Sequence, residues 1–408
     1  MMLTVYSISV NFNIVDSSSR EDIIARIKAG YSLPSLSSVA LKLVQMASNE
    51  FSSLTEMAEL IEMDPGLAVR LLRIANNAFF RPTEPVSTIE QAIMRIGVTH
   101  LRVMALSLSL RDTFPMGKSG KMDYEKFWRS SLYQALLAKS FAQKLGTCNP
   151  EEAFVAGLIL ETGLLIFFDI FIKGMEIDRN LELYPLEKLL AWEKEHYFID
   201  HREIGAAVLD YWKFPPAIVE CQHIYNIKSK TGEMPPLALI SEMARECSAL
   251  ICEQSMEWGP LLLRAKEIYG IDQDTLTDIL ISTFDVVQDI AEGLKVEMNR
   301  DKDIIALVEK ANLSLAELSE RVLELQGAVS KQGLPSFEQL GDLKNLPDVK
   351  EILQAVAHEI RNPLMAVGGF AKKLSLALDP SSEGWKYVQI IVDESNRLES
   401  ALAKMTAL

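Results

Sequence analysis

The sequence predicts an all-α protein with two or three domains. Its 408 residues are 49% hydrophobic, which is ample for packed cores. Apolar residues recur every three or four positions along most of the chain, the spacing of amphipathic helices. No run shows the sustained alternation of a strand. We therefore expect a large helical domain, then connector helices, then a carboxyl-terminal helical hairpin.

The first domain is expected at residues 20–235, after an amino-terminal segment at 1–19. Helix signals divide it into elements. Asp64 precedes Pro65, and proline at the first helical position is a good start signal. Gly97 closes the fourth run, because glycine commonly ends helices. The predicted helices are 35–47, 54–62, 65–76, 89–96, 101–110, 124–145 and 151–168.

Charge and cysteine content exclude several classes of protein. Lys and Arg number 41 against 56 Asp and Glu, a net charge of -15, so there is no basic footprint for nucleic acid. The cysteines lack metal-ligand spacing, and a chain of this size needs no disulfides, so we expect reduced cytosolic thiols. These cysteines are Cys148, Cys221, Cys247 and Cys252.

The longest apolar stretch, 153–172, is interrupted by Glu161, Gly163 and Asp169. It is therefore expected to be a core helix and not a membrane span. Residues 1–15 lack the basic start and the small-residue cleavage site of a secretory signal. We expect a cytoplasmic protein with no membrane partner.

Residues 236–300 are predicted to add helices to the first domain, and 301–344 to form a connector and hinge. Apolar residues step by threes and fours over 304–329, nearly four heptads. Two interpretations stay open: a parallel coiled coil, or an amphipathic helix that lies on the first domain. Gly333 and Pro335 then break regular helix.

Residues 345–408 are predicted to form a helical hairpin, with breakers at 379–384 between its helices. A lone hairpin cannot bury both of its apolar seams, so two copies are expected to pair into a four-helix bundle as a homodimer. The seam residues are Leu353, Val356, Ile360, Leu364, Val367, Ala371, Leu374 and Leu378, then Val388, Ile391, Ser395, Leu398, Leu402 and Met405.

His358 lies off the first seam and shares an outward helix face with Asn362, one turn later. Its imidazole is therefore expected to project into water, where it can meet a partner. Pro363 removes a backbone donor and crowds the carbonyl of Glu359, which loosens the helix one turn after the histidine.

The motif at 358–363, His-Glu-Ile-Arg-Asn-Pro, followed by a helical hairpin, resembles the HisKA phosphoacceptor module of two-component sensor histidine kinases. The resemblance implies that a neutral ring nitrogen of His358 attacks the terminal phosphate of ATP. It implies that Glu359 is the general base and that Asn362 positions the reacting groups. It also implies a response-regulator receiver domain as partner.

Phosphoryl transfer needs a nucleotide cradle with metal and backbone donors, so ATP and Mg²⁺ are implied for an ATP-binding domain. The sequence shows neither an asparagine box nor a glycine-rich lid. We therefore expect no cofactor in this chain and no phosphorylation by it alone. It is expected to be part of a longer kinase, or else a phosphoacceptor protein served by a separate kinase.

Short sequence segments across most of residues 30–230 resemble the HDOD family, which are helical signalling relatives of the HD phosphohydrolases. The segments that carry the resemblance are 33–34, 64–67, 71–76, 89–97, 200–205 and 211–216.

An HD hydrolase needs a His-Asp pair to hold a divalent metal. Here Leu160 and Glu161 stand at that site. His201 and His223 are then expected to be isolated, with too few partners for a metal, and to cap a helix or hydrogen-bond within the core. The sequence therefore predicts no metal site and no phosphodiesterase.

Together these features predict a cytoplasmic sensor histidine kinase fragment. An HDOD input domain would control autophosphorylation of His358 and phosphotransfer to a response-regulator aspartate. The alternative is a non-catalytic HDOD scaffold that uses the hairpin only for dimerisation. The presence of His358, Glu359 and Asn362 together argues against it, because a pure dimeriser does not require those groups.

Overall fold

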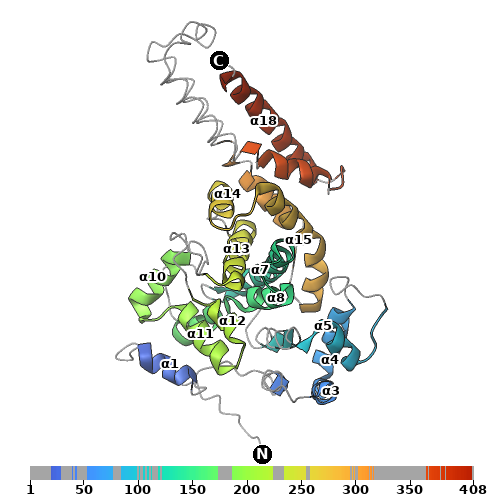
Figure 1. The fold of residues 1–408 in the computed structure, drawn as a ribbon, viewed down its shortest axis with the longest axis vertical. Coiled ribbons are helices and arrows are strands. Elements are labelled where there is room, and N and C mark those ends of the chain that lie inside the picture. The colour runs from blue at the N-terminus through green and yellow to red at the C-terminus, as the bar shows by residue number, and fades with distance from the viewer. Residues whose placement is uncertain are drawn as a thin grey trace, which may run out of the picture. The chain divides into compact units, whose positions relative to one another are not determined.

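The computed structural model describes most of residues 20–28, 53–112, 118–172, 186–223, 234–253, 258–316 and 364–406. The described residues are almost entirely helical, which confirms the all-α fold class (Figure 1). The chain divides into two compact units. The first comprises Met1–Ser131, Leu158–Asn226 and Pro235–Ala238, and the second comprises Leu132–Gly157, Ile227–Met234 and Leu239–Leu408.

The helices of the first unit are short. They are α1 (Arg20–Lys28), α3 (Leu54–Glu62), α4 (Pro65–Ala75), α5 (Ile89–Ile96), α9 (Thr162–Phe167), the π-helical turn η2 (Phe168–Ile172), α10 (Leu186–Tyr197), α11 (His201–Tyr211) and α12 (Pro216–Glu220). Among them, α3, α4, α5 and α11 begin with a capping side chain. Two strands, β1 (Lys118–Ser119) and β2 (Met122–Asp123), pair antiparallel.

The predicted starts and stops of α3, α4 and α5 match the structure closely. Ser53 and Glu56 form a reciprocal capping box at the start of α3, and the Asp64 side chain accepts the Leu67 N–H at the start of α4. Gly97 ends α5 with φ 83°, a conformation that favours glycine. The predicted helices at 35–47 and 101–110 lie largely outside the described residues.

The single helix predicted at 151–168 is wrong, because the chain breaks at Leu160 and Glu161 between α8 (Pro150–Ile159) and α9. Gly163, just after the break, explains the geometry. A Cβ on Gly163 would lie 1.9 Å from the His201 carbonyl oxygen and 2.7 Å from the Gly205 nitrogen. Helices α9 and α11 therefore pack backbone against backbone, and the break turns α9 onto α11.

The apolar segment around this break is a buried core segment. Pro150–Ile172 is long and apolar enough to cross a bilayer, but 89% of its most apolar window is buried inside the structure. Length and composition alone are therefore weak evidence for a span.

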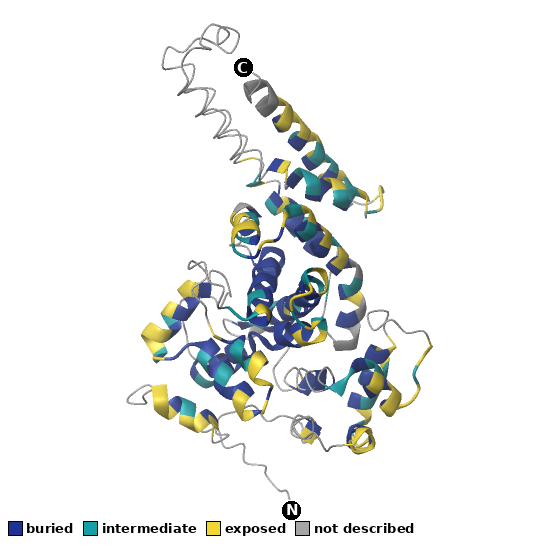
Figure 2. Cartoon of the chain, viewed as in Figure 1, coloured by how far each residue is buried: buried dark blue, intermediate teal, exposed yellow. Residues whose placement is uncertain are grey.

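The second unit holds longer helices. It contains most of α7 (Tyr124–Leu145), most of α8, then α13 (Pro236–Cys252), α14 (Trp258–Glu267), α15 (Gln273–Leu294), the helical residues 302–311 and 367–376, and α18 (Glu383–Thr406). Figure 2 shows that α7 and α13 are buried on most sides. Tyr133 of α7 packs edge-on against Phe284 of α15, with ring centroids 5.7 Å apart.

The first part of the connector packs on its own chain. Ile304, Leu307 and Val308 are all buried in the second unit. The buried Asp303 carboxylate accepts the Tyr133 hydroxyl at 2.8 Å. For residues 302–311 the structure thus favours an amphipathic helix lying on a domain over a coiled coil. The rest of the connector, 317–344, lies outside the described residues.

The hairpin seam is buried within a single chain, in the part of the hairpin that the structure describes. Those seam residues, all buried, are Leu364, Val367, Ala371, Leu374, Val388, Ile391, Ser395 and Leu398. The expectation that a lone hairpin cannot cover its seams is therefore wrong for these residues. It failed because it counted only the two hairpin helices, whereas Phe370 also packs against Trp258 of α14.

Candidate functional site

The predicted phosphoacceptor motif lies outside the described residues, but most of the helix that follows it is described and well packed. His358, Glu359 and Asn362 lie outside the described residues, so their roles remain predictions. The helix that follows the motif is described from Leu364 onward. Asp379 begins the turn between the two hairpin helices.

The hairpin turn is closed by Asp379, whose carboxylate accepts the backbone N–H of Ser381 at 2.8 Å and its hydroxyl at 2.7 Å. These hydrogen bonds lower the pKa of Asp379, since they stabilise its charged form. Gly368 and Ser395 lie face to face across the hairpin, where a Cβ on Gly368 would be 2.9 Å from the Ser395 Cβ. This close approach brings the two helices together.

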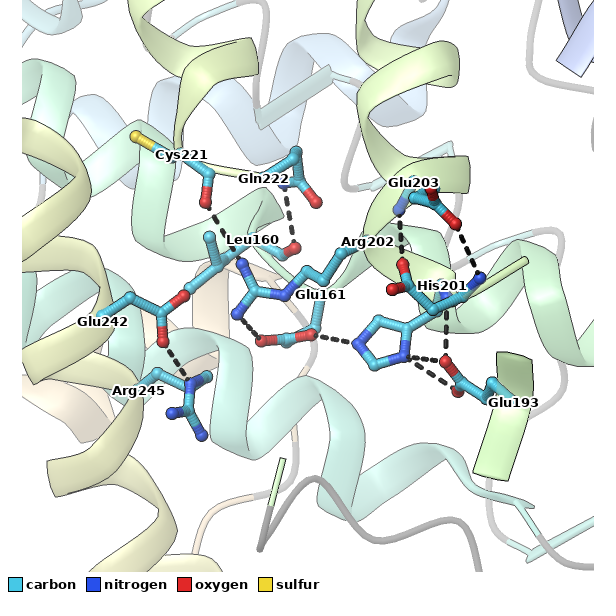
Figure 3. Close-up of polar contacts among 11 residues, drawn as sticks. Leu160, Glu161, Glu193, His201, Arg202, Glu203, Cys221, Gln222, Glu242 and Arg245 are labelled. Atoms are coloured by element: carbon cyan, nitrogen blue, oxygen red, sulfur yellow. Dashed lines mark hydrogen bonds and ion pairs between the residues drawn. The ribbon is translucent and has the colours of Figure 1, made fainter. Parts of the chain in front are cut away.

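A second site, in the HDOD-like part of the sequence, is a buried network of four charged side chains. Glu161, Glu193, His201 and Arg202 are each 0–1% exposed. They come from the α8–α9 break, from α10 and from the start of α11, as Figure 3 shows. All four belong to the first unit.

His201 lies between two carboxylates. Its Nδ1 is 2.8 Å from Glu193, and its Nε2 is 3.1 Å from Glu161 (Figure 3). Burial by itself lowers the pKa of His201, but the charges and hydrogen bonds of Glu193 and Glu161 outweigh it and raise the pKa to about 9. At neutral pH the ring is therefore an imidazolium that donates to both carboxylates.

Arg202 completes the charge balance. Its Nη2 donates to Glu161 at 2.7 Å, and its Nη1 donates to the Cys221 carbonyl at 3.2 Å. Nearby, Gln222 Nε2 donates to the Leu160 carbonyl at 3.0 Å. Two cations thus face two anions, and the arrangement satisfies the requirement that buried charges be paired.

This network does not fit the metal of an HD hydrolase. Both ring nitrogens of His201 are bound to carboxylates, and the guanidinium of Arg202 is the cation against Glu161. Within the described ranges, no group of three or more His, Cys, Asp or Glu side chains could hold a metal ion. The charged groups of the network bind one another and hold α9, α10 and α11 together.

His201 and His223 differ from the expectation that both are isolated. His201 hydrogen-bonds within the core, as expected, but it has two carboxylate partners. His223 is not in the core: its side chain is 59% exposed, with Nδ1 3.6 Å from Glu220. Sequence reasoning missed Glu193, because nothing in its local pattern distinguishes a buried carboxylate from the exposed ones on α10.

A capping box in the sequence marks the start of α11, the helix that carries His201. Asp200 and Glu203 form a capping box, in which the Asp200 carboxylate accepts the Glu203 N–H at 2.7 Å. Outside the box, Lys194 lies 2.9 Å from Asp200 and Arg20 lies 2.7 Å from Glu203. The cap fixes where α11 begins, and so fixes the position of His201, its first residue.

Comparisons with known proteins match two domain families. Residues 33–226 match the HDOD domain, and residues 348–408 match the His Kinase A (phospho-acceptor) domain, while no ATP-binding domain is detected in these 408 residues.

Two curated proteins are similar to this chain over part of its length. An uncharacterized protein of Treponema pallidum is 24% identical over 50% of this chain and 40% of its own length. The uncharacterized protein YuxH of Bacillus subtilis is 27% identical over 59% of this chain and 52% of its own length. The chain thus spans about half or less of these curated relatives.

Among solved structures, a putative phosphohydrolase from Shewanella amazonensis is 24% identical, covers 67% of this chain and 97% of its own, and has a TM-score of 0.49. The family matches therefore carry the assignment. The chain therefore contains an HDOD domain at residues 33–226 and a His Kinase A phospho-acceptor domain at residues 348–408.

Proposed function

We propose that this histidine-kinase-like signalling protein is phosphorylated on His358 and passes the phosphoryl group to an aspartate of a response-regulator receiver domain. In this scheme a ring nitrogen of His358 forms a bond to the terminal phosphorus of ATP as the bond to the ADP oxygen breaks. Glu359 takes the ring proton and Asn362 positions the reacting groups. ATP and Mg²⁺ come with a separate ATP-binding domain.

The observation that carries this proposal is the match of the phospho-acceptor family over residues 348–408, which includes His358. The described part of the hairpin supports it, because the buried seam and the Asp379 turn hold the helix that follows the motif. A fixed helix after the histidine is what a phosphoacceptor needs, since transfer depends on positioning.

The HDOD domain is proposed to be regulatory and not hydrolytic. Its buried Glu161, Glu193, His201 and Arg202 bind one another, as a structural network does. A domain without a catalytic metal can still bias a partner domain between two states. Because Pro150–Ile172 is largely buried, we further propose a cytoplasmic protein. The match to the phospho-acceptor domain supports the proposal that it acts as a dimer through its hairpin.

The test is acid-labile labelling of the chain from ATP, with an ATP-binding domain of a related kinase added in trans. We expect label in the wild-type chain and in His223→Gln, a matched control at an exposed histidine. We expect none in His358→Gln. If the wild-type chain and His223→Gln both stay unlabelled by a catalytic domain that labels another phospho-acceptor module, the phosphorylation proposal fails and the scaffold alternative is favoured.

A further inference from the structure

The helix that follows the phosphoacceptor motif is held from one side by α14. The rings of Trp258 and Phe370 have centroids 4.7 Å apart and are tilted by 49°. Both side chains are about 1% exposed. A large indole thus covers the one aromatic residue on this helix, within the second unit of the fold.

Charged side chains extend this contact along α15. Lys373 Nζ lies 2.8 Å from an Asp278 carboxylate oxygen and 3.4 Å from an Asp274 carboxylate oxygen. Gly369 faces Gln273, since a Cβ on Gly369 would be 3.4 Å from the Gln273 amide nitrogen. One helical turn of the hairpin, 369–373, is therefore docked on the two helices. We call Trp258, Gln273, Asp274 and Asp278 the clamp.

The clamp occupies the edge of the apolar seam. Phe370 comes three residues after Val367 and four before Leu374, so it shares a helix face with these two seam residues. Packed helices lie about 8–10 Å apart, axis to axis. A helix from a second copy of the chain could therefore pack on this face only if no other side chain covered it. Trp258 covers that access at Phe370 in the same chain.

Two buried polar atoms in and near the clamp find no hydrogen-bond partner in the described part of the chain. They are Trp258 Nε1 in the clamp and Ser395 Oγ on the hairpin seam, opposite Gly368. Burying an unpartnered polar group costs free energy. The unpartnered Trp258 Nε1 therefore lowers the stability of the docked contact, which favours its release.

We propose that α14 and α15 compete with a second copy of the chain for the phosphoacceptor hairpin, so that release of the clamp promotes the dimeric four-helix bundle. This inference rests on the proposed function for its importance, since a dimeric hairpin matters because it carries His358. It gives the part of the chain between the two family domains a role of its own: the clamp acts on the hairpin directly and not only through the connector.

The test is the dimer dissociation constant of the 408-residue chain, measured by sedimentation equilibrium. Trp258→Ala removes the apolar contact and should lower this constant about tenfold. Asp278→Lys places a like charge beside Lys373 and should lower it about two- to fivefold at low salt. The exchanged pair Lys373→Asp with Asp278→Lys should restore the wild-type value.

Lys372→Glu is the matched control, because Lys372 is exposed and adjacent to Lys373 in sequence. It should leave the dissociation constant unchanged. Trp258→Ala could unfold α14, which would make its result uninformative. Asp278→Lys is therefore the second variant, because the Asp278 side chain is 58% exposed and its replacement leaves the core intact. Amide hydrogen exchange over 367–376 should speed up in the monomer of either clamp variant.

An unchanged or higher dissociation constant in both clamp variants, or a chain that stays monomeric in all of them, overturns the proposal. This outcome is distinct from failure of the proposed function. Absence of label on His358 in every variant would contradict phosphorylation, while the dimer measurement would still decide whether the clamp competes with the second copy.

Discussion

At the scale of single residues, His201 shows how a buried charge depends on its neighbours. The sequence marked it as a remnant of a metal site, yet it is an imidazolium held by Glu193 and Glu161. Its place in the core, at the start of a helix, could be predicted from the sequence. Its charge could not, because the two carboxylates come from elements eight and forty residues away.

The raised pKa of His201 makes stability depend on pH. A group whose pKa rises on folding stabilises the native state fully below its unfolded value, here 6.5, and that stability is lost as pH rises towards about 9. We expect the urea midpoint of the wild-type chain to fall between pH 6.5 and pH 9. Glu193→Gln should flatten this dependence, because burial then favours the neutral ring.

Glu193→Gln should also destabilise the chain by about 3 kcal/mol at pH 6.5, because the variant loses the charged hydrogen bond between the Glu193 carboxylate and the protonated His201 ring. Glu187→Gln, on the exposed face of the same helix α10, is the control and should change neither the midpoint nor its pH dependence. A pH profile of Glu193→Gln that parallels the wild type would mean that His201 is not the titrating group.

At the scale of elements, local signals predicted α3, α4 and α5 well, because their caps are written in adjacent residues. The break between α8 and α9 could not be predicted in this way. Its cause is a contact with α11, some forty residues later, and no local pattern around Glu161 records it. Apolar periodicity alone continues through the break.

Gly163 tests this explanation of the break. In Gly163→Ala the new Cβ would collide with the His201 carbonyl and the Gly205 nitrogen, both backbone atoms that cannot move aside. We expect a loss of about 3 kcal/mol or more in unfolding free energy, measured by urea denaturation. Gly384→Ala in α18 is the control, because its Cβ would make only an ordinary 3.7 Å contact with Leu378.

That control should be neutral or slightly stabilising, since alanine suits a helix better than glycine. If Gly163→Ala were as stable as Gly384→Ala, the close approach of α9 and α11 would not be what fixes the break.

At the scale of the whole chain, the order of domains followed from sequence motifs, whereas the contacts that join distant segments did not. The seam at 304–311 fitted either a coiled coil or a helix on a domain, because periodicity records that a face is buried but not what covers it. The same limit hid the clamp. Trp258 and Phe370 are more than a hundred residues apart, and neither belongs to a motif.

A buried hydrogen bond between Tyr133 and Asp303 is a second contact between distant segments that no motif predicted. It joins α7 to the first turn of the connector across 170 residues, and both groups are buried. Tyr133→Phe removes the hydroxyl donor with little change in shape. It should lower the free energy of local opening of residues 302–311 by about 1–3 kcal/mol, because the Asp303 carboxylate stays buried with one donor fewer.

Native-state amide hydrogen exchange measures this attachment, since it reports local opening separately from global unfolding. Exchange over 302–311 should become faster in Tyr133→Phe. Tyr387→Phe, at a half-exposed tyrosine of α18, should leave it unchanged. Faster exchange over 302–311 without any change over 367–376 would show that connector and hairpin are held by separate contacts, so that either could be released alone. Equal acceleration of both segments would instead show that they open as one cooperative unit, with the Tyr133–Asp303 bond as a shared support.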